Sequence, residues 1–189
     1  RDRREGDHAM KIKPILRKIT IVTAITGLAA TTLGLMFYAA GGRVNTTRSI
    51  PVGLYWTSSK PVEKGTYVLL CPPPVEAIAE AKRRGYLTTG FCPGKLGYMM
   101  KKILAAKDDA VAITDEGVTV NGAMLPLSAP MAIDKYGRAL PRYQHTKFVI
   151  SDNEVLVMSD VNGKSFDGRY FGPILRSQIQ TVIVPVITW

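Results

Sequence analysis

The chain has 189 residues, of which 46% are hydrophobic, and this leaves room for one membrane segment and one domain of about 150 residues. Its net charge of +10 arises from 25 Lys and Arg against 15 Asp and Glu, and residues 1–18 supply 7 − 3 = +4 of that excess. Beyond them, tight basic clusters occur only at 82–84 and 101–102, without interleaved aromatic residues that would stack on bases. The composition therefore argues against a nucleic-acid partner.

An uncharged, apolar run of 22 residues extends from Ile19 to Ala40. As a helix it would be about 33 Å long, which is enough to cross the hydrocarbon core of a bilayer. The basic residues that precede it place the N-terminal end in the cytoplasm by the positive-inside rule. We therefore expect a cytoplasmic segment over residues 1–18, a single-pass signal anchor over 19–40 in the inner membrane, and a periplasmic domain over 41–189. A cleavable signal peptide is the alternative, although its apolar core usually has only about 7–15 residues.

Short β-branched and aromatic runs, separated by turn residues, fill the rest of the chain. Regular breaks of this kind indicate a mainly β domain that forms a β-barrel or a coiled sheet. One short amphipathic helix is expected at 75–87, after three prolines and with its end near Gly85. The pair Asn121-Gly122 predicts a tight hairpin turn. The expected strands are 52–56, 66–71, 98–105, 111–114, 117–121, 123–127, 147–150, 154–158 and 179–187.

Cys71 and Cys92 are the only cysteines, and they bracket the expected helix. In an exported domain, a disulfide that closes this loop would contribute roughly 3 kcal/mol of stability. Two free buried thiols are the alternative. Imidazoles come only from His8 and His145, so we expect neither a metal site nor a cofactor.

Two hydroxyls, those of Thr47 and Ser49, follow closely after the apolar run. Only eight residues, 41–48, separate the run from Ser49, so Ser49 lies at most about 26 Å from the end of the helix. A reactive group there would act on substrates held in or near the bilayer. Serine is a common residue, however, and a serine nucleophile also needs a base close by.

Few residues can serve as the base for Ser49. A Ser-His-Asp triad would need His145, because His8 precedes the membrane segment, but no neighbouring signature distinguishes His145 from a plain surface or loop histidine. Lysine remains. Lys101 and Lys102 lie in an expected strand, where successive side chains alternate between faces, so one can be buried while the other is solvated. Burial is the direct way to lower a lysine pKa by the roughly 3 units, worth about 4 kcal/mol, that a base near neutral pH needs.

A polar stretch over residues 159–172 follows an apolar strand and is dense in glycine and short side chains. Such a composition is typical of a surface loop. Within it, Asp167 and Arg169 are near enough in sequence to pair, and the Ser165 hydroxyl is able to hydrogen-bond an amine. From the residues alone, a surface loop and a polar site both stay open.

Three blocks in this order, around Ser49, Lys101 and residues 165–169, resemble the signal peptidase I superfamily of Ser/Lys membrane proteases. The segments NTTRSIPVGLYW, GFCPGKLGYMMKKILAAKDD and SFDGRYFGP are similar to the TraF type, the conjugative-transfer peptidase that matures the pilin subunit. The resemblance covers essentially all of residues 46–172. It implies a signal-peptidase-like fold, with a catalytic domain after the anchor.

The resemblance also implies a role for the side chains in these blocks. Ser49 corresponds to the nucleophile and Lys101 to the general base. Thr47 corresponds to the hydroxyl donor of the oxyanion hole, next to the backbone N–H of Ser49. The residues that correspond to the lysine-orienting hydroxyl and to the supports of its loop are Ser165, Asp167 and Arg169.

Two departures from the leader peptidases point away from an ordinary preprotein substrate. Ile50 replaces the methionine that follows their nucleophile, and residues 159–162 replace Gly-Asp-Asn-Arg. The TraF resemblance implies instead a membrane-held propilin, whose C-terminal end is trimmed and joined to its own N-terminus through an acyl-enzyme. It also implies contact with conjugative type IV secretion components. The alternatives are a general type I signal peptidase and a non-catalytic, membrane-anchored component of a conjugation or secretion channel.

Overall fold

The computed structural model describes residues 2–143 and 147–189, with side chains from residue 16 onward. His145 lies outside the described residues, so its assignment as a plain loop histidine stays a prediction. The chain divides into two compact units, Arg1–Gly42 and Arg43–Trp189.

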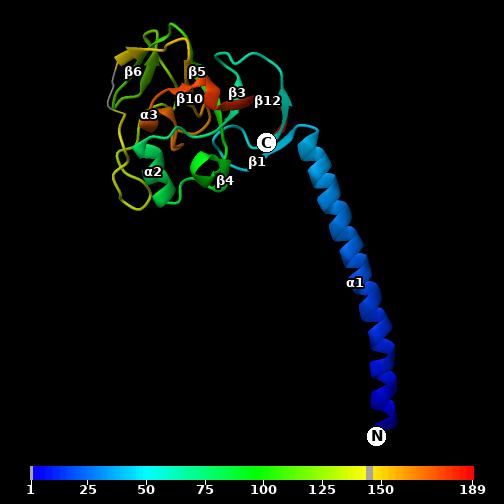
Figure 1. Ribbon diagram of the computed structural model, residues 1–189. Coiled ribbons are helices and arrows are strands. Elements are labelled where there is room, and N and C mark those ends of the chain that lie inside the picture. The colour runs from blue at the N-terminus through cyan, green and yellow to red at the C-terminus, as the bar shows by residue number, and fades with distance from the viewer. Residues whose placement is uncertain (1, 144–146) are drawn as a thin grey trace. The chain divides into compact units, whose positions relative to one another are not determined.

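The first unit is dominated by one long helix, α1, which runs from Asp2 to Ala39 (Figure 1). Among the described residues, only its segment Leu16–Ala39 is long and apolar enough to cross a membrane. The expected span, 19–40, lies within this segment except for its last residue. Three hydroxyls of the segment donate to the carbonyl four residues earlier, so they are satisfied without water. They belong to Thr20, Thr31 and Thr32.

Seven strands form the larger sheet of the second unit, in the spatial order β1-β2-β12-β3-β5-β10-β11. The pairs from β2 through β11 are antiparallel. Because β1 and β11 end this order, the described part of the chain forms an open sheet, not a closed barrel. Its strands, several of which are labelled in Figure 1, are β1 (Gly42–Asn45), β2 (Gly53–Ser58), β12 (Ile179–Thr188), β3 (Tyr67–Leu70), β5 (Met99–Ala105), β10 (Glu154–Met158) and β11 (Ile174–Leu175).

A smaller sheet of four antiparallel strands has the order β8-β7-β6-β9. Val120 pairs with Ala123, so Asn121 and Gly122 alone form the loop between β7 and β8. Both have positive φ, +53° and +82°, as a type I′ hairpin turn requires. The predicted hairpin is confirmed. The strands are β8 (Ala123–Met124), β7 (Val118–Val120), β6 (Ala110–Ile113) and β9 (Lys147–Val149).

The second unit also contains two short helices, α2 (Glu76–Arg83) and α3 (Gly168–Phe171). α2 is shorter than the predicted helix because Gly85 takes a left-handed φ of +74°, which ends the helix before it. α3 is a single turn that the sequence analysis did not predict, and Asp167 caps it. The remaining elements are β4 (Thr89–Cys92) and two 3₁₀ turns, η1 (Pro93–Lys95) and η2 (Arg176–Gln178).

The prediction of a mainly β domain is confirmed, and every predicted strand has an observed counterpart. Cys71, directly after β3, forms a disulfide with Cys92 at the end of β4, so the predicted pairing is also confirmed. The loop that this bond closes carries α2, whose buried Ile78 packs in the same cluster as both cysteines. A separate buried cluster consists of Ile50, which precedes β2, together with Tyr55 from β2, Leu69 from β3 and Ile183 from β12.

Candidate active site

Ser49 lies in the turn that joins β1 to β2, residues 46–52, which we call the serine turn. Its next residue, Ile50, is fully buried. The Tyr55 hydroxyl, from β2, donates to the Pro51 carbonyl at 2.7 Å. These contacts anchor the end of the turn in the core while the Ser49 side chain stays half-exposed. Ser49 is therefore fixed in place but open to a substrate.

Lys101 projects toward this turn from the middle of β5. Alternate residues of β5 are buried, and Lys101 belongs to the buried set, with only 2% of its surface exposed. Its Nζ lies 3.2 Å from Ser49 Oγ and 2.5 Å from Ser165 Oγ, and it donates to both oxygens. The structure thus brings the three predicted residues into one hydrogen-bonded group.

The environment of Lys101 disfavours its charge. Burial lowers the pKa of Lys101 from 10.5 to about 8; the nearby Asp167 carboxylate opposes this shift and the Arg169 guanidinium adds to it. An amine with such a pKa is neutral in a substantial fraction of molecules near pH 8, and its lone pair can then accept the Ser49 proton. This arrangement would allow a proton to pass from Ser49 to Lys101.

Lys102 lies on the opposite face of β5 and is half-buried. Its Nζ forms an ion pair with Asp160 Oδ2 at 2.8 Å. The Tyr67 hydroxyl donates to the same oxygen at 2.9 Å, and Lys102 Nζ lies 5.1 Å from the centre of the Tyr67 ring. Lys102 is thus engaged with other partners and does not reach Ser49.

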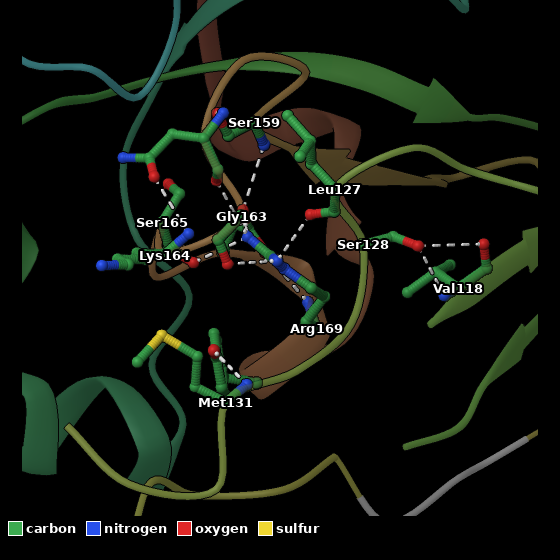
Figure 2. Close-up of polar contacts among 12 residues, drawn as sticks. Val118, Leu127, Ser128, Met131, Ser159, Gly163, Lys164, Ser165 and Arg169 are labelled. Atoms are coloured by element: carbon green, nitrogen blue, oxygen red, sulfur yellow. Dashed lines mark hydrogen bonds and ion pairs between the residues drawn. The ribbon is translucent and has the colours of Figure 1, made fainter. Parts of the chain in front are cut away.

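Asp167 and Arg169 form an ion pair in the interior, and each side chain is completely buried. Arg169 Nε lies 2.8 Å from Asp167 Oδ1, and Nη2 lies 2.9 Å from Oδ2, so the contact is bidentate. Figure 2 shows the Arg169 guanidinium between the backbones of separate loop segments. It donates to the carbonyls of Leu127, Gly163 and Ser165, at 3.0, 2.7 and 2.9 Å. This pair fixes the backbone that carries the Ser165 hydroxyl.

Thr47 is exposed on the serine turn, and its hydroxyl donates to Asn45 Oδ1 at 3.0 Å. A hydroxyl has one proton to donate, so in this state the Thr47 proton is held by Asn45. The backbone N–H of Ser49 donates to no acceptor among the described residues. That N–H is available to an oxyanion as it stands, whereas the Thr47 hydroxyl must first turn away from Asn45.

Comparison with known proteins identifies the family of this mainly β chain. Residues 13–189 match the family described as signal peptidase, peptidase S26. The chain belongs to this family.

Relatives in this peptidase S26 family include proteins of plasmid transfer. Plasmid transfer protein TraF of Escherichia coli is 64% identical over 175 residues, which are 93% of this chain and 98% of that protein. Conjugal transfer protein TraF of Agrobacterium fabrum is 33% identical over 175 residues, which are 92% and 97% of the two chains. A crystal structure of signal peptidase I from Enterococcus faecalis covers 67% of this chain, with 14% identity and a TM-score of 0.38. The two TraF matches confirm the TraF-type resemblance.

In this S26 peptidase-family chain, Ser49 and Lys101 line a cleft of about 500 Å³. Thr47 and Ser165 line the same cleft, so four of the predicted site residues face one cavity. Ile50 does not line it, because its side chain packs in the core. Ile50 thus has a packing role, and the different substrate inferred from this departure stays a prediction.

The walls of the cleft carry more positive than negative charge. Besides Lys101, the cationic residues that line it are Arg48, Lys135 and Lys164. The one carboxylate among the lining residues is that of Asp134, which binds Arg138 Nε at 2.6 Å and accepts from the Tyr86 hydroxyl. Burial alone would raise the pKa of Asp134, but hydrogen bonds from Tyr86 and Arg138 hold it well below its usual range. The charged side chains that line the cleft therefore carry a net positive charge.

Sequence reasoning missed two parts of this site. Asn45 was not singled out, although an Asn two residues before a Thr is the pattern of an Asx turn. The wall formed by Tyr86 and Asp134 was also missed, because these residues are 48 positions apart and no local pattern joins them.

Proposed function

We propose that this chain is a membrane-anchored serine peptidase of conjugation, in which Ser49 is the nucleophile and Lys101 is the general base. The observation that supports the proposal most directly is the buried Lys101 amine, within hydrogen-bond distance of both Ser49 and Ser165. The names of the relatives, plasmid transfer and conjugal transfer proteins, support the role in conjugation.

The proposed reaction begins when neutral Lys101 accepts the Ser49 proton and Ser49 Oγ attacks the scissile carbonyl. Ser165 holds the amine in line during this transfer. The oxyanion is bound by the Ser49 N–H and the Thr47 hydroxyl, each worth about 2.7–4 kcal/mol. Lys101, now protonated, gives its proton to the leaving amine, and an acyl-enzyme remains.

The proposed substrate is a membrane-held propilin that loses its C-terminal end. An acyl-enzyme is hydrolysed when water attacks it, but a well-positioned amine competes with an effective molarity of about 10⁵ M or more. If the amine is the propilin's own N-terminus, the product is a cyclic subunit. Cyclisation then requires positioning of that amine and no further catalytic group.

The proposed topology has α1 as a single-pass anchor in the inner membrane, with residues 1–18 in the cytoplasm and the catalytic domain in the periplasm. The basic residues before the apolar segment support this orientation. The disulfide between Cys71 and Cys92 suits an oxidising compartment. A periplasmic site next to the membrane would also place the enzyme near conjugative type IV secretion components.

The test is propilin processing by variants with one substitution each. Ser49→Ala and Lys101→Ala should abolish processing, whereas Lys102→Ala should process at close to the normal rate. Mass spectrometry of the mature pilin then identifies the product, because the cyclic form is lighter than the linear one by one water. Normal processing by Ser49→Ala would leave a non-catalytic channel component as the better assignment. A linear product would favour a simple hydrolase of the leader peptidase type.

A further inference from the structure

Asn45 is the last residue of β1, and it is buried, with 3% of its surface exposed. It precedes the serine turn, and it takes no part in the group formed by Ser49, Lys101 and Ser165. Buried polar side chains are expected to be fully hydrogen-bonded, so the partners of its amide reveal what it holds.

The amide nitrogen of Asn45 contacts the serine turn on both sides of Ser49. Nδ2 lies 2.7 Å from the Thr47 carbonyl oxygen, on the N-terminal side. It lies 3.0 and 2.9 Å from the carbonyl oxygens of Ile50 and Pro51, on the C-terminal side. The two amide hydrogens are thus shared among three carbonyl acceptors. One short side chain therefore bonds to the turn both before and after Ser49.

The amide oxygen of Asn45 is occupied by Thr47. Oδ1 accepts from the Thr47 N–H at 3.1 Å and from the Thr47 hydroxyl at 3.0 Å. Carbonyl oxygens only accept and the Thr47 N–H only donates, so these partners also determine which way the amide faces. No other side-chain type offers two donors and a two-lone-pair acceptor at this length.

We propose that Asn45 is a positioning residue of the active site: it pins both ends of the serine turn and holds the Thr47 hydroxyl beside Ser49. This inference rests on the proposed function, because it concerns the alignment of the proposed nucleophile and oxyanion donor. A displacement of about 1 Å in such a group can lower a rate by roughly 100-fold. During the reaction the Thr47 hydroxyl turns from Asn45 Oδ1 to the oxyanion, while its backbone stays bound.

The first experiment needs no substrate: it tests the position of residue 49 relative to Lys101 through the rate at which a thiol at residue 49 is alkylated. In full-length Ser49→Cys, the new thiol is the only free one, because Cys71 and Cys92 are bonded to each other. A lysine close to a thiol lowers the thiol pKa and speeds its alkylation by iodoacetamide at pH 7. Adding Asn45→Ala should slow alkylation at least fivefold, toward the rate of Ser49→Cys/Lys101→Met. An unchanged rate would overturn the proposal.

The matched control for that experiment is Ser128→Ala. Ser128 is also 3% exposed, and its hydroxyl accepts from the Val118 N–H (Figure 2) and donates to the Leu125 carbonyl. Ser128 is not among the residues that line the cleft. Both substitutions should lower the melting temperature, but only Asn45→Ala should slow the alkylation of residue 49. Equal slowing by both would mean that the effect is general destabilisation, and it would overturn the positioning role.

The second experiment measures kcat and KM with a synthetic peptide that spans the C-terminal processing junction of the propilin. Asn45→Ala should lower kcat at least tenfold with a change in KM of less than threefold. Asn45→Asp keeps the acceptor for Thr47 but places a carboxylate against three carbonyls, so it should lower kcat as well. Wild-type kcat in Asn45→Asp would contradict the pinning of the turn.

A double-mutant cycle tests whether Asn45 acts through Thr47. Thr47→Val removes the hydroxyl and keeps the shape of the side chain. If Asn45 holds this hydroxyl, Asn45→Ala should lower kcat much less in the Thr47→Val background than in the parent. Full additivity would overturn that half of the proposal. Failure of the dyad itself looks different: Ser49→Cys and Ser49→Cys/Lys101→Met would then be alkylated at equal rates, whatever residue 45 is.

Discussion

At the scale of single residues, the site depends on a lysine placed where a positive charge is disfavoured. Lys101 is buried between Ser49 and Ser165, and burial lowers its pKa to about 8. Lys102, one position on, keeps a carboxylate partner and stays half-solvated. The alternation of faces along β5 thus separates the buried lysine, which we propose as the base, from its half-solvated neighbour.

The rate of peptide cleavage should depend on the fraction of Lys101 that is neutral. Because the base must be neutral, kcat/KM in the wild type should rise with pH and level off above the pKa of about 8. The measurement is a profile of kcat/KM between about pH 6 and about pH 10. Lys102→Met should keep the same midpoint. A flat profile, or one that falls across this interval, would contradict Lys101 as the base.

The same burial should make Lys101 a destabilising residue. Its pKa is lower in the folded chain, about 8, than the ordinary value of 10.5, so the unfolded chain binds the proton more tightly. This penalty is fully present below pH 8 and fades as the pH rises to 10.5, so stability should increase over that interval. Lys101→Met should therefore be inactive yet more stable at pH 7, by up to about 3 kcal/mol.

Urea denaturation of Lys101→Met at pH 7 and pH 10 tests this expectation. The gain in the free energy of unfolding should shrink at the higher pH, because pH 10 lies well above the folded pKa of about 8 and close to the ordinary value of 10.5, where most of the cost of the buried charge is gone. Lys102→Met serves as the control and should show no gain, since it loses the ion pair with Asp160. An equal gain at both values of pH would mean that packing, and not charge, is responsible.

At the scale of elements, the loop before α3 carries Ser165, which contacts Lys101. Asp167 caps α3, accepts from the Ser159 N–H at 3.0 Å and pairs with Arg169. Arg169 in turn donates to backbone carbonyls of the surrounding loops, among them those of Leu127, Gly163 and Ser165. One buried ion pair therefore connects the end of β10, the turn of α3 and the segment that carries Ser165.

Asp167→Ala should destabilise the chain by about 3–5 kcal/mol, because it leaves the Arg169 guanidinium buried without its carboxylate. Thermal unfolding measures the loss. The control is Asp152→Ala, which removes an exposed ion pair with Lys107 of similar length, 2.7 Å, and should change stability by less than about 1 kcal/mol. Similar losses for the two variants would contradict a structural role for the buried pair.

How far the sequence predicts this site depends on how local each feature is. The faces of β5 and the hairpin at Asn121-Gly122 follow from periodicity and turn residues, and they agree with the structure. The short strands β1, β4 and β11 were missed, because two to four residues carry too little pattern. The binding of Leu127 by Arg169 spans 42 positions and is determined by tertiary packing.

The residues of the candidate site and their neighbours show the same division. Ser49 and Lys101 were selected by chemistry, elimination and resemblance to a family, and the fold places them 3.2 Å apart although 52 positions separate them. Ile50 illustrates the opposite case. Its difference from the leader peptidases predicts a different substrate, whereas the sequence did not predict its complete burial in the core.

At the scale of the whole molecule, the chain separates anchoring from chemistry. The unit Arg43–Trp189 contains the core clusters, the disulfide and the cleft, whereas Arg1–Gly42 contains the apolar helix. The candidate site thus belongs to the unit that has its own core, and the apolar helix belongs to the other unit. Anchoring of enzyme and substrate in one membrane raises their effective concentration without any new contact.

Removal of residues 1–40 should therefore separate the two contributions. The shortened chain, which begins just before β1, should unfold at nearly the same temperature as the full chain, because its core is intact. Its kcat/KM for a soluble junction peptide should stay within threefold of the full chain, but processing of membrane-held propilin should fall by roughly 100-fold or more. In detergent, where enzyme and propilin no longer share a membrane, the two chains should process propilin at similar rates.

Equal processing of propilin in membranes would show that the helix contributes nothing to substrate encounter. Loss of peptide cleavage in the shortened chain would show that the domain needs the helix to fold or to act.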